Sequence, residues 1–553
     1  MIKPILFSAT LAAATTAFVL VGCGGSSSSN NNGNNGSDSG STSTNPGGGD
    51  GGGTTMTGDN DAGGGKKGSD DGGGSAANPP LPDGSILPHG NQLATGQYIT
   101  INGVTSDDYV VYTDTNGNVS ALSLASGSKA ISLGTVDPNA NVRVMGKTVF
   151  IPTTVSQSTG AASISVWTSK ATAASPLTTS GLTDTYAASS DGSFVAFFEN
   201  LDATGSTATM SVAAGDGSNK TQLVPGVDLA DNICFPFVSF GGSTLVATYC
   251  EVGDAGGVDA GEADGGTNVN VGVVTSFSGA SWTPVNLASN SQTVFSLNSA
   301  GTQVVVITAA GSALVPIGGG TAVPIDPNAE IGAITLNPGI QTNDGTGVIY
   351  TTTANALERA TTTAPVTMTQ LGAPQKFNDV FGLSSDQKWL IGTSGQDANS
   401  GAADLYLASA TAAGASVTLS STQTAGAGNG SDLFTTDSTA ALFFTSFSFQ
   451  GGGGTGTLTA QKVSGGAPTV LGQNSIFALG TSAAKVVFNE NFNQQTFGAD
   501  LYGVDTSAAT PAPTLLVTQA DPSFYLNAEK TTIIYTWSYD TSASAGLWTL
   551  AAP

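Results

Sequence analysis

The sequence predicts an all-β protein built from repeated small sheets, and three observations predict it. Runs of β-branched and aromatic residues, five or six long, are bounded by Gly, Asn, Asp and Ser, which is typical of strands buried on both faces. An aromatic residue, a short polar turn and an apolar strand recur along the chain. A second short sequence, Asp-Leu-Tyr or Gly-Leu-Trp, also recurs. Its copies Asp404–Tyr406 and Asp500–Tyr502 lie 96 residues apart, and Gly546–Trp548 follows 46 residues later.

Short strands and Gly-rich turns at a period of about 40 to 50 residues indicate propeller blades, each a four-stranded sheet. We therefore expect residues 91–553 to form a β-propeller of about 8 to 10 units, in one ring rather than two, with the recurring aromatic residues packed between blades. The clearest copies are 186–198, 295–307 and 381–391, followed by 434–444, 477–488 and 525–535, and the turn and strand alone recur near 107–112, 146–151 and 241–246.

The last unit ends at Trp548–Leu550, one outer strand short of a full blade. Tyr98–Ile101, at the front of the domain, is the strand that we expect to complete this unit. Such a clasp would join the two ends of the domain, which favours one closed circuit over two.

The segment Ser189–Phe197 resembles the blade motif of TolB-type propellers, a PD40 or WD40-like repeat. The Asp-Leu-Tyr elements are similar to the third strand of that family, and the resemblance spans residues 95–553. It implies an architecture and no particular activity. Most copies lack the Pro that the family places before the Asp, and the chain has about ten units where that family has six.

At the N-terminus, Ile5–Val21 is almost entirely small or apolar, and Leu20–Cys23 matches a lipobox at all four positions. Residues 1–22 thus resemble a bacterial lipoprotein signal peptide. The resemblance implies cleavage before Cys23 and acylation of its thiol and its new amine, which gives lasting membrane anchorage. Gly24 stands where Asp often marks inner-membrane retention, so we expect the outer membrane, on its periplasmic or surface face. The alternative is an ordinary secretory signal with a chance Cys.

Residues 23–90 comprise the lipidated Cys and a tether rich in Gly, Ser, Asn and Asp, which has too few apolar side chains to form a core. As a Gly-rich coil of about 65 residues, it has a root-mean-square span of roughly 45 Å. Asp59–Asp61 faintly resembles a calcium loop, but the bidentate Glu that ends such loops is missing.

Cys234 and Cys250 flank Gly241–Gly242 almost symmetrically. In a hairpin that turns at these glycines the two cysteines would lie about 5 Å apart, within range of a disulfide. We predict that bond, and two separate buried thiols are the alternative. The acidic insertion 253–266 follows, which we interpret as a solvated loop, with calcium capture as the weaker alternative.

The formal net charge is −25, of which Lys3 contributes +1 and residues 24–89 contribute −5, leaving −21 on the folded region. Binding of nucleic acid or anionic lipid headgroups needs clustered Lys or Arg, which this sequence lacks. We therefore expect no nucleic-acid partner, whereas a basic protein or a cation stays possible.

We expect no catalytic residues, cofactor or metal. His89 is the only histidine and lies at the edge of the tether, so a Ser-His-Asp triad and a His-ligated zinc site lack a donor within the core. A carboxylate that recurs at the same turn of many blades accepts backbone N–H bonds there; the alternative is a glycosidase pair. These turn carboxylates are Asp107, Asp191, Asp344, Asp386 and Asp437, and non-repeated carboxylates are Glu251, Glu358 and Glu490.

We thus predict a monomeric, lipid-anchored envelope protein whose propeller binds a protein or a glycan without catalysis. The alternative is a carbohydrate-active propeller enzyme, a polysaccharide lyase or glycosidase that uses carboxylates and tyrosines. An enzyme would gather several non-repeated Asp, Glu, Tyr or Arg side chains around one mouth of the channel. A scaffold would carry repeat-equivalent residues there.

Overall fold

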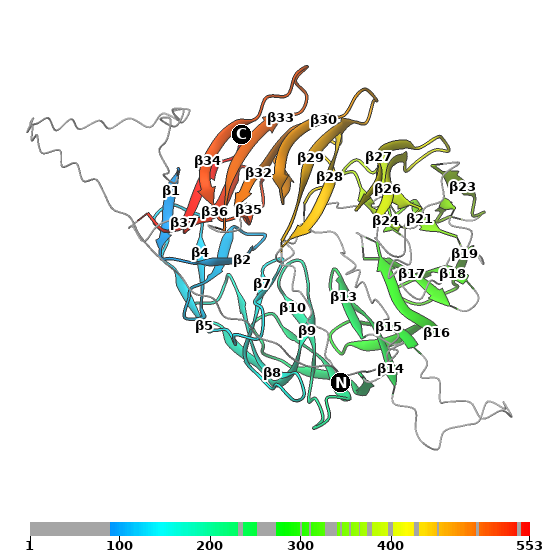
Figure 1. The fold of residues 1–553 in the computed structure, drawn as a ribbon. Helices are drawn as coiled ribbons and strands as arrows, with labels where there is room; N and C mark the ends of the chain where they lie inside the picture. The colour runs from blue at the N-terminus through cyan, green and yellow to red at the C-terminus, as the bar shows by residue number, and fades with distance from the viewer. Residues whose placement is uncertain are drawn as a thin grey trace, which may run out of the picture. The chain divides into compact units, whose positions relative to one another are not determined.

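The computed structural model describes residues 89–229, 236–251, 272–298, 301–308, 311–326, 340–342, 345–352, 356–363, 365–372, 379–395, 402–424, 431–450, 453–493, 497–538 and 544–553. The expected signal peptide, the tether and the acidic insertion 253–266 lie outside these residues. Every regular element in the described part is a strand, as expected from the sequence (Figure 1). Within that part, no helix has the length and apolar character that crossing a bilayer requires.

The strands form ten consecutive antiparallel units, numbered here in chain order. Unit 1 comprises β2 (Thr100–Val104), β3 (Tyr109–Thr113), β4 (Asn118–Ser123) and β5 (Ile131–Thr135). Unit 2 comprises β6 (Arg143–Met145), β7 (Thr148–Val155), β8 (Ala161–Thr168) and the first half of β9 (Ser175–Ala188). Unit 3 comprises the second half of β9, β10 (Phe194–Glu199), β11 (Thr207–Ala214) and β12 (Thr221–Asp228).

Unit 4 comprises β13 (Phe237–Gly241), β14 (Thr244–Glu251), β15 (Gly272–Ser278) and the first part of β16 (Thr283–Leu297). Unit 5 comprises the rest of β16, β17 (Gln303–Thr308), β18 (Gly311–Pro316) and β19 (Val323–Asp326). Unit 6 comprises β20 (Ile340–Gln341), β21 (Gly347–Thr351), β22 (Leu357–Thr361) and β23 (Met368–Leu371). Unit 7 comprises β24 (Asp379–Leu383), β25 (Trp389–Ser394), β26 (Ala402–Ser409) and β27 (Val417–Thr424).

Unit 8 comprises β28 (Ala440–Gln450), β29 (Gly453–Lys462) and β30 (Thr469–Ser475), with Phe434 bridged to Ala441 in the place of a first strand. Unit 9 comprises β31 (Ala478–Gly480), β32 (Lys485–Asn493), β33 (Gly498–Asp505) and β34 (Thr514–Ala520). Unit 10 comprises β35 (Phe524–Leu526), β36 (Thr532–Trp537), β37 (Gly546–Ala551) and the N-terminal strand β1 (Asn91–Thr95).

Units 2 to 5 share hydrogen-bonded strands. The long strand β9 pairs first with β8 and then with β10, so it is the last strand of one unit and the first strand of the next. β16 does the same between β15 and β17, and β12 pairs briefly with β14. These links join the four units into one 14-stranded sheet, whereas the other six units are separate sheets of three or four strands.

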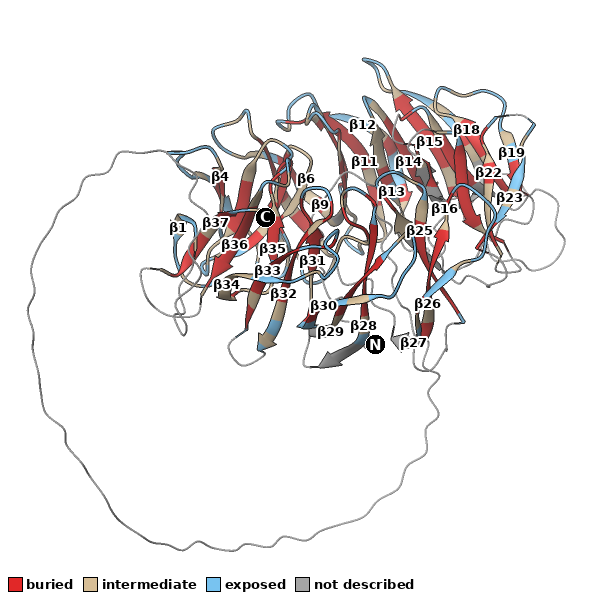
Figure 2. Cartoon of the chain, turned by 90° about the horizontal axis from the view of Figure 1, so that it is seen from above, coloured by how far each residue is buried: buried red, intermediate tan, exposed pale blue. Residues whose placement is uncertain are grey.

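Hydrophobic cores between consecutive units hold the domain together, and Figure 2 shows that the buried residues lie along the strands. The described residues form ten cores, each with side chains from two neighbouring units, and one of these cores joins unit 10 to unit 1 through Leu547, Ile534 and Ile101. The cores therefore make one circuit of ten blades, although none of the described sheets closes on itself. The domain is a β-propeller.

The recurring aromatic residues pack between units, as expected, wherever their side chains are described. Tyr186 in β9 stacks on Phe150 of the preceding unit, with ring centroids 4.6 Å apart. Phe434 is buried in a core with side chains of unit 7, and Tyr525 is buried against unit 1. Burial raises the pKa of Tyr525 to about 12, so its hydroxyl stays protonated and donates to the carbonyl of Ile101.

A clasp completes unit 10, but the expected strand was wrong. Asn91–Thr95, not Tyr98–Ile101, pairs antiparallel with β37, from Asn91 opposite Thr549 to Thr95 opposite Gly546. Positive φ angles at Gly96 and Tyr98 turn the chain between β1 and β2, which carries Ile101 into the first strand of unit 1. The Tyr535 hydroxyl also accepts from the backbone N–H of His89 and fixes the start of the domain.

Candidate functional site

Two of the three cysteines singled out in the sequence, Cys23 and Cys234, lie outside the described residues. Cys250 in β14 is fully buried and disulfide-bonded. The hairpin of β13 and β14 turns at Gly241–Gly242, and Gly241 lies opposite Thr244. The pairing of Cys250 with Cys234 stays a prediction.

Each unit has two ends. At the turn end, the first strand turns into the second and the third turns into the fourth. At the hairpin end, the second strand turns into the third and the fourth leads to the next unit. Neighbouring antiparallel units with this connectivity place all ends of one kind on the same side of the domain.

The turns between the first and second strands share one backbone feature in all ten units. One residue in each adopts a left-handed backbone, with φ between 48° and 72°, and five of the ten are glycines. Glycine adopts this conformation without steric cost, whereas other residues pay about 1 kcal/mol. The ten residues are Asp108, Gly146, Gly192, Gly242, Gly301, Gly345, Gln387, Ser438, Ala483 and Lys530.

Asp191 shows how a turn carboxylate is used. One of its oxygens accepts from the Ser189 hydroxyl at 2.7 Å and from the Ser193 N–H at 2.9 Å, and the other accepts from the Ser193 hydroxyl at 2.7 Å. The bonds from Ser193, then that from Ser189, lower the pKa of Asp191 to about 2. The Ser189 hydroxyl in turn accepts from the N–H of Phe194, the first residue of β10. The carboxylate therefore holds the turn in its register.

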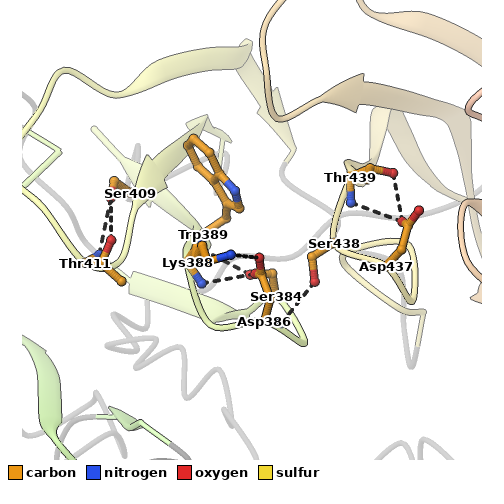
Figure 3. A network of polar contacts seen from close by, with 9 residues as sticks. All are labelled: Ser384, Asp386, Lys388, Trp389, Ser409, Thr411, Asp437, Ser438 and Thr439. Carbon is orange, nitrogen blue, oxygen red and sulfur yellow. Dashed lines mark hydrogen bonds and ion pairs between the residues drawn. The ribbon is translucent and has the colours of Figure 1, made fainter.

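Asp386 and Asp437 repeat this arrangement in units 7 and 8 (Figure 3). Asp386 accepts from Ser384 and from the N–H of Lys388, and the Lys388 ammonium lies 3.2 Å from it. Asp437 accepts from the hydroxyls of Thr435 and Thr439. Partial burial opposes ionisation of both carboxylates, but the hydrogen bonds outweigh it and lower each pKa.

Asp107 accepts from the hydroxyl of Thr105 in its own turn and from that of Ser169 in unit 2. Asp344 lies outside the described residues. Asp191, Asp386 and Asp437 each accept a backbone N–H of their own turn, as predicted for the turn carboxylates. For Asp107 the bonds come from two hydroxyl groups instead.

The turns also contact one another. Ser106 donates its N–H to the carbonyl of Gly146, and Ala528 donates its N–H to Asp108, which links units 1 and 2 and units 10 and 1. Figure 3 shows the link between units 7 and 8, in which the N–H of Asp386 donates to the Ser438 hydroxyl at 3.0 Å. These polar groups of the turn end are therefore hydrogen-bonded to neighbouring units of the protein.

A buried carboxylate in unit 3 forms an ion pair with a partly exposed lysine. Glu199, whose side chain is 3% exposed, lies 2.8 Å from the ammonium of Lys220 and accepts from the Ser211 hydroxyl at 2.7 Å. The Lys220 nitrogen also lies 5.9 Å from the ring centroid of Phe197. The charge of the Glu199 carboxylate is thus balanced by Lys220, and its oxygens are hydrogen-bonded, as burial of a carboxylate requires. We therefore assign Glu199 a structural role.

Two of the non-repeated carboxylates have acidic neighbours that the sequence did not reveal. Glu358 accepts from the Tyr350 hydroxyl at 3.2 Å; burial, then the charges of Asp326 and Glu358, raise the pKa of that phenol. Glu490 lies directly opposite Asp500 in the ladder of β32 and β33. Burial, then the charges of Asp500 and Glu490, likewise raise the pKa of Tyr502. The side chain of Glu251 lies outside the described part.

The two ends of the domain differ in charge. All eight described lysines lie at the turn end, where eight carboxylates accompany them. The described arginines, Arg143 and Arg359, lie within strands, opposite Phe150 and Ile349. The lysines are Lys129, Lys147, Lys170, Lys220, Lys388, Lys462, Lys485 and Lys530, and the accompanying carboxylates are Asp107, Asp108, Asp191, Asp216, Asp386, Asp437, Asp505 and Glu529.

At the hairpin end the described residues include twelve carboxylates and no lysine. Turn-end lysines reach two of the twelve, since Glu199 lies 2.8 Å from the Lys220 ammonium and Asp432, in the connection between β27 and Phe434, lies 3.3 Å from the Lys530 ammonium. Lys376, in the connection between β23 and β24, lies outside the described part. The carboxylates are Asp114, Asp137, Glu199, Asp202, Asp228, Asp326, Glu358, Asp404, Asp432, Glu490, Asp500 and Asp521.

Three exposed aromatic side chains of the described residues also lie at the hairpin end, and Phe237, the first residue of β13, is 40% exposed. Tyr98, between β1 and β2, is 66% exposed, and Phe497, beside the first residue of β33, is 63% exposed. Phe497 forms an edge-to-face pair with Phe492, with ring centroids 5.6 Å apart. In the part of the chain that the structure describes, no group of three or more His, Cys, Asp and Glu side chains is arranged to hold a metal.

Comparison with known proteins finds weak similarity to solved structures. No family model and no curated protein matches the chain. A eukaryotic initiation factor is 12% identical, with 78% of this chain and 91% of that chain covered and a TM-score of 0.42. The β-propeller domain of the Trilobed protease from Pyrococcus furiosus is 12% identical over 69% and 98% of the two chains, with a TM-score of 0.30. TolB from Acinetobacter baumannii is 14% identical over 47% and 58%, with a TM-score of 0.25. At these TM-scores the likeness carries no argument about activity.

Proposed function

We propose that this protein is a lipid-anchored, non-catalytic binding module of the cell envelope, and that the hairpin end of its propeller is the recognition surface. The observation that supports this proposal is the charge difference between the two ends. The turn end has as many described lysines as accompanying carboxylates, and several of these carboxylates fix turns. The hairpin end carries many carboxylates, no described lysine and three exposed aromatic side chains.

The difference in charge between the two ends of the domain favours binding over catalysis. The acidic neighbours at the hairpin end form two separate pairs that lie in distant parts of the chain, Asp326 with Glu358 in units 5 and 6 and Glu490 with Asp500 in unit 9. An enzyme of the lyase or glycosidase class needs its carboxylates gathered around one substrate, about 5 to 10 Å apart. Complementary charge spread over a surface instead raises the rate of association and the specificity for a protein partner.

Anchorage is the first part to test. In the proposal Cys23 carries the acyl chains and residues 24–90 set the reach of the propeller from the outer membrane. The variant Cys23→Ser should move from the membrane fraction to the soluble fraction after cell lysis. Retention of this variant with membranes would contradict the proposed anchor.

Recognition is tested by photo-cross-linking from the two ends of the same unit. Asn116 lies in the hairpin between β3 and β4, and Ser126 lies between β4 and β5 at the turn end; both are exposed. With a benzophenone side chain introduced at one position at a time, intact cells should give a discrete cross-linked product from Asn116 and none from Ser126. Equal products from both positions, or no product, would overturn the assignment of the hairpin end.

A further inference from the structure

The hairpin of β32 and β33 in unit 9 exposes an apolar surface beside two carboxylates. The patch is defined here by four residues, Glu490, Phe492, Phe497 and Asp500. Phe497 is one of six large hydrophobic side chains that are exposed in the described residues, and it forms a ring pair with Phe492. An aromatic pair at the end of a hairpin, away from any core, does not stabilise the fold by burial.

The two carboxylates of the patch face each other without a cation. Glu490 lies directly opposite Asp500 across the ladder. Glu490 accepts from the N–H of Gln473 at 3.0 Å, and Asp500 accepts from the N–H of Gln519 at 3.1 Å and from Asn491 at 3.2 Å. Neither forms an ion pair within the described residues. Like charges directly opposite in a sheet are destabilising, so this arrangement has a cost that a bound cation would remove.

The arrangement matches the chemistry that recognises Arg and Lys side chains. A guanidinium stacks on an aromatic face and donates paired N–H bonds to carboxylates, and an ammonium is likewise attracted to the ring face. The hairpin end surrounds the patch with further carboxylates and no described lysine, so the field there attracts a polycation and repels a polyanion. We propose that this patch binds a basic segment of a protein partner, with an Arg or Lys side chain between the aromatic pair and the two carboxylates.

This inference rests on the proposed function and names the class of partner. A neutral glycan would also stack on exposed aromatic rings, but it gains nothing from two adjacent carboxylates without a cation. Charge complementarity therefore selects a basic protein segment, and glycan binding is an outcome of the test.

The test uses the full-length lipidated protein in a neutral detergent. The probes are a fluorescent ten-residue peptide of alternating Arg and Ser, a Glu and Ser peptide of the same length, and a neutral glucose oligosaccharide. Fluorescence anisotropy measures peptide affinity at low and at high salt, and the oligosaccharide competes. We expect binding of the Arg peptide alone, weakening as salt screens the charges.

Single variants locate the site. Phe497→Ala and Asp500→Asn should each weaken binding of the Arg peptide about fivefold, the effect expected for one cation–π or charge-assisted contact. Asp505→Asn is the matched control, because Asp505 ends the same strand β33 at the turn end. Met368→Ala is the control for an exposed apolar side chain, since Met368 is 53% exposed at the turn end. Neither control should change the affinity.

The inference would be overturned if the Asp500→Asn and Phe497→Ala variants bound the Arg peptide with the affinity of the wild type. It would also be overturned if the protein preferred the oligosaccharide to the Arg peptide. If cross-linking from Asn116 still succeeds in that case, recognition by the hairpin end survives and only the partner class is wrong. If the Arg peptide binds as expected but no cross-link forms at Asn116, the patch survives and the wider recognition surface fails. Circular dichroism of each variant confirms that the sheets are intact.

Discussion

The turn end and the hairpin end of this propeller are made from the same strands, yet they use polar residues differently. At the turn end, Asp191, Asp386 and Asp437 each accept bonds from the Ser or Thr side chains of their own turn. At the hairpin end, Glu490 and Asp500 face each other and Phe497 is exposed. Carboxylates at the hairpin end also fix turns, since Asp114, Asp137 and Asp202 accept backbone N–H bonds there. The two ends therefore differ in the facing carboxylates, in the exposed aromatic rings and in the lack of a described lysine at the hairpin end.

Backbone crowding gives the sharpest contrast between the two ends. Gly301, at a turn end, has φ of 64°, and an added Cβ would lie 2.4 Å from the Cα of Gly241 in the neighbouring unit. Gly160, in a hairpin-end loop, has φ of 74° and open space around it. Gly301→Ala should lower the free energy of unfolding by about 3 kcal/mol or more, because clash adds to backbone strain, and Gly160→Ala by about 1 kcal/mol. Denaturant unfolding measures both; equal losses would contradict the crowding at the turn end.

The second prediction concerns ionisation of a turn carboxylate. Asp191→Asn should lower stability by about 1 kcal/mol at neutral pH, the usual cost of removing a capping carboxylate at an exposed site. Since the pKa of Asp191 is lowered to about 2 in the folded protein, its contribution is complete above the unfolded pKa near 3.8. It is lost as the pH falls toward 2. Unfolding of wild type and variant, followed from pH 7 to pH 2, should converge; a constant difference would show that ionisation is not involved.

The third prediction uses a turn that lacks glycine. Ala483 holds the left-handed position of unit 9 with φ of 48°. Ala483→Gly should raise stability by about 0.5 kcal/mol, since relief of strain exceeds the extra entropy of the unfolded chain. Ala484→Gly, at a buried neighbour with an ordinary φ, is the control and should lower the thermal midpoint. A lower midpoint for Ala483→Gly would contradict the role given to this position.

The smallest expected effect is at the hairpin end. Glu490→Gln keeps an oxygen to accept the N–H of Gln473 and removes one of two facing charges. Stability should rise by a few tenths of a kcal/mol at low salt, and the gain should shrink as salt screens the repulsion. Thermal unfolding at two salt concentrations measures it. A loss of stability would mean that the two carboxylates do not repel each other in the folded protein.

Most of the fold could be predicted because a blade is specified locally. The apolar strand Phe194–Phe198 directly follows a polar turn whose residues fix the register of that strand. This pair of turn and strand recurs often enough along the sequence to predict the period and about ten units. The position of the clasp could not be predicted, because pairing of Asn91 with Thr549 joins residues far apart in sequence. Tyr98–Ile101 has the stronger strand composition, but the positive φ of Gly96 and Tyr98 places that segment in unit 1.

The sequence by itself determined the strands, the turns, the role of the turn carboxylates and the net negative charge, since these depend on neighbours along the chain. Only the tertiary structure decided which charges share a surface, because each reversal of chain direction sends consecutive segments to opposite ends of a unit. Lys485 and Glu490 are five residues apart and lie toward opposite ends of one strand, whereas Glu490 and Asp500 meet across a ladder. The net charge depends only on composition, whereas the electrostatic field depends on where the charges lie in space. The fold therefore places the excess of negative charge at one end of the domain.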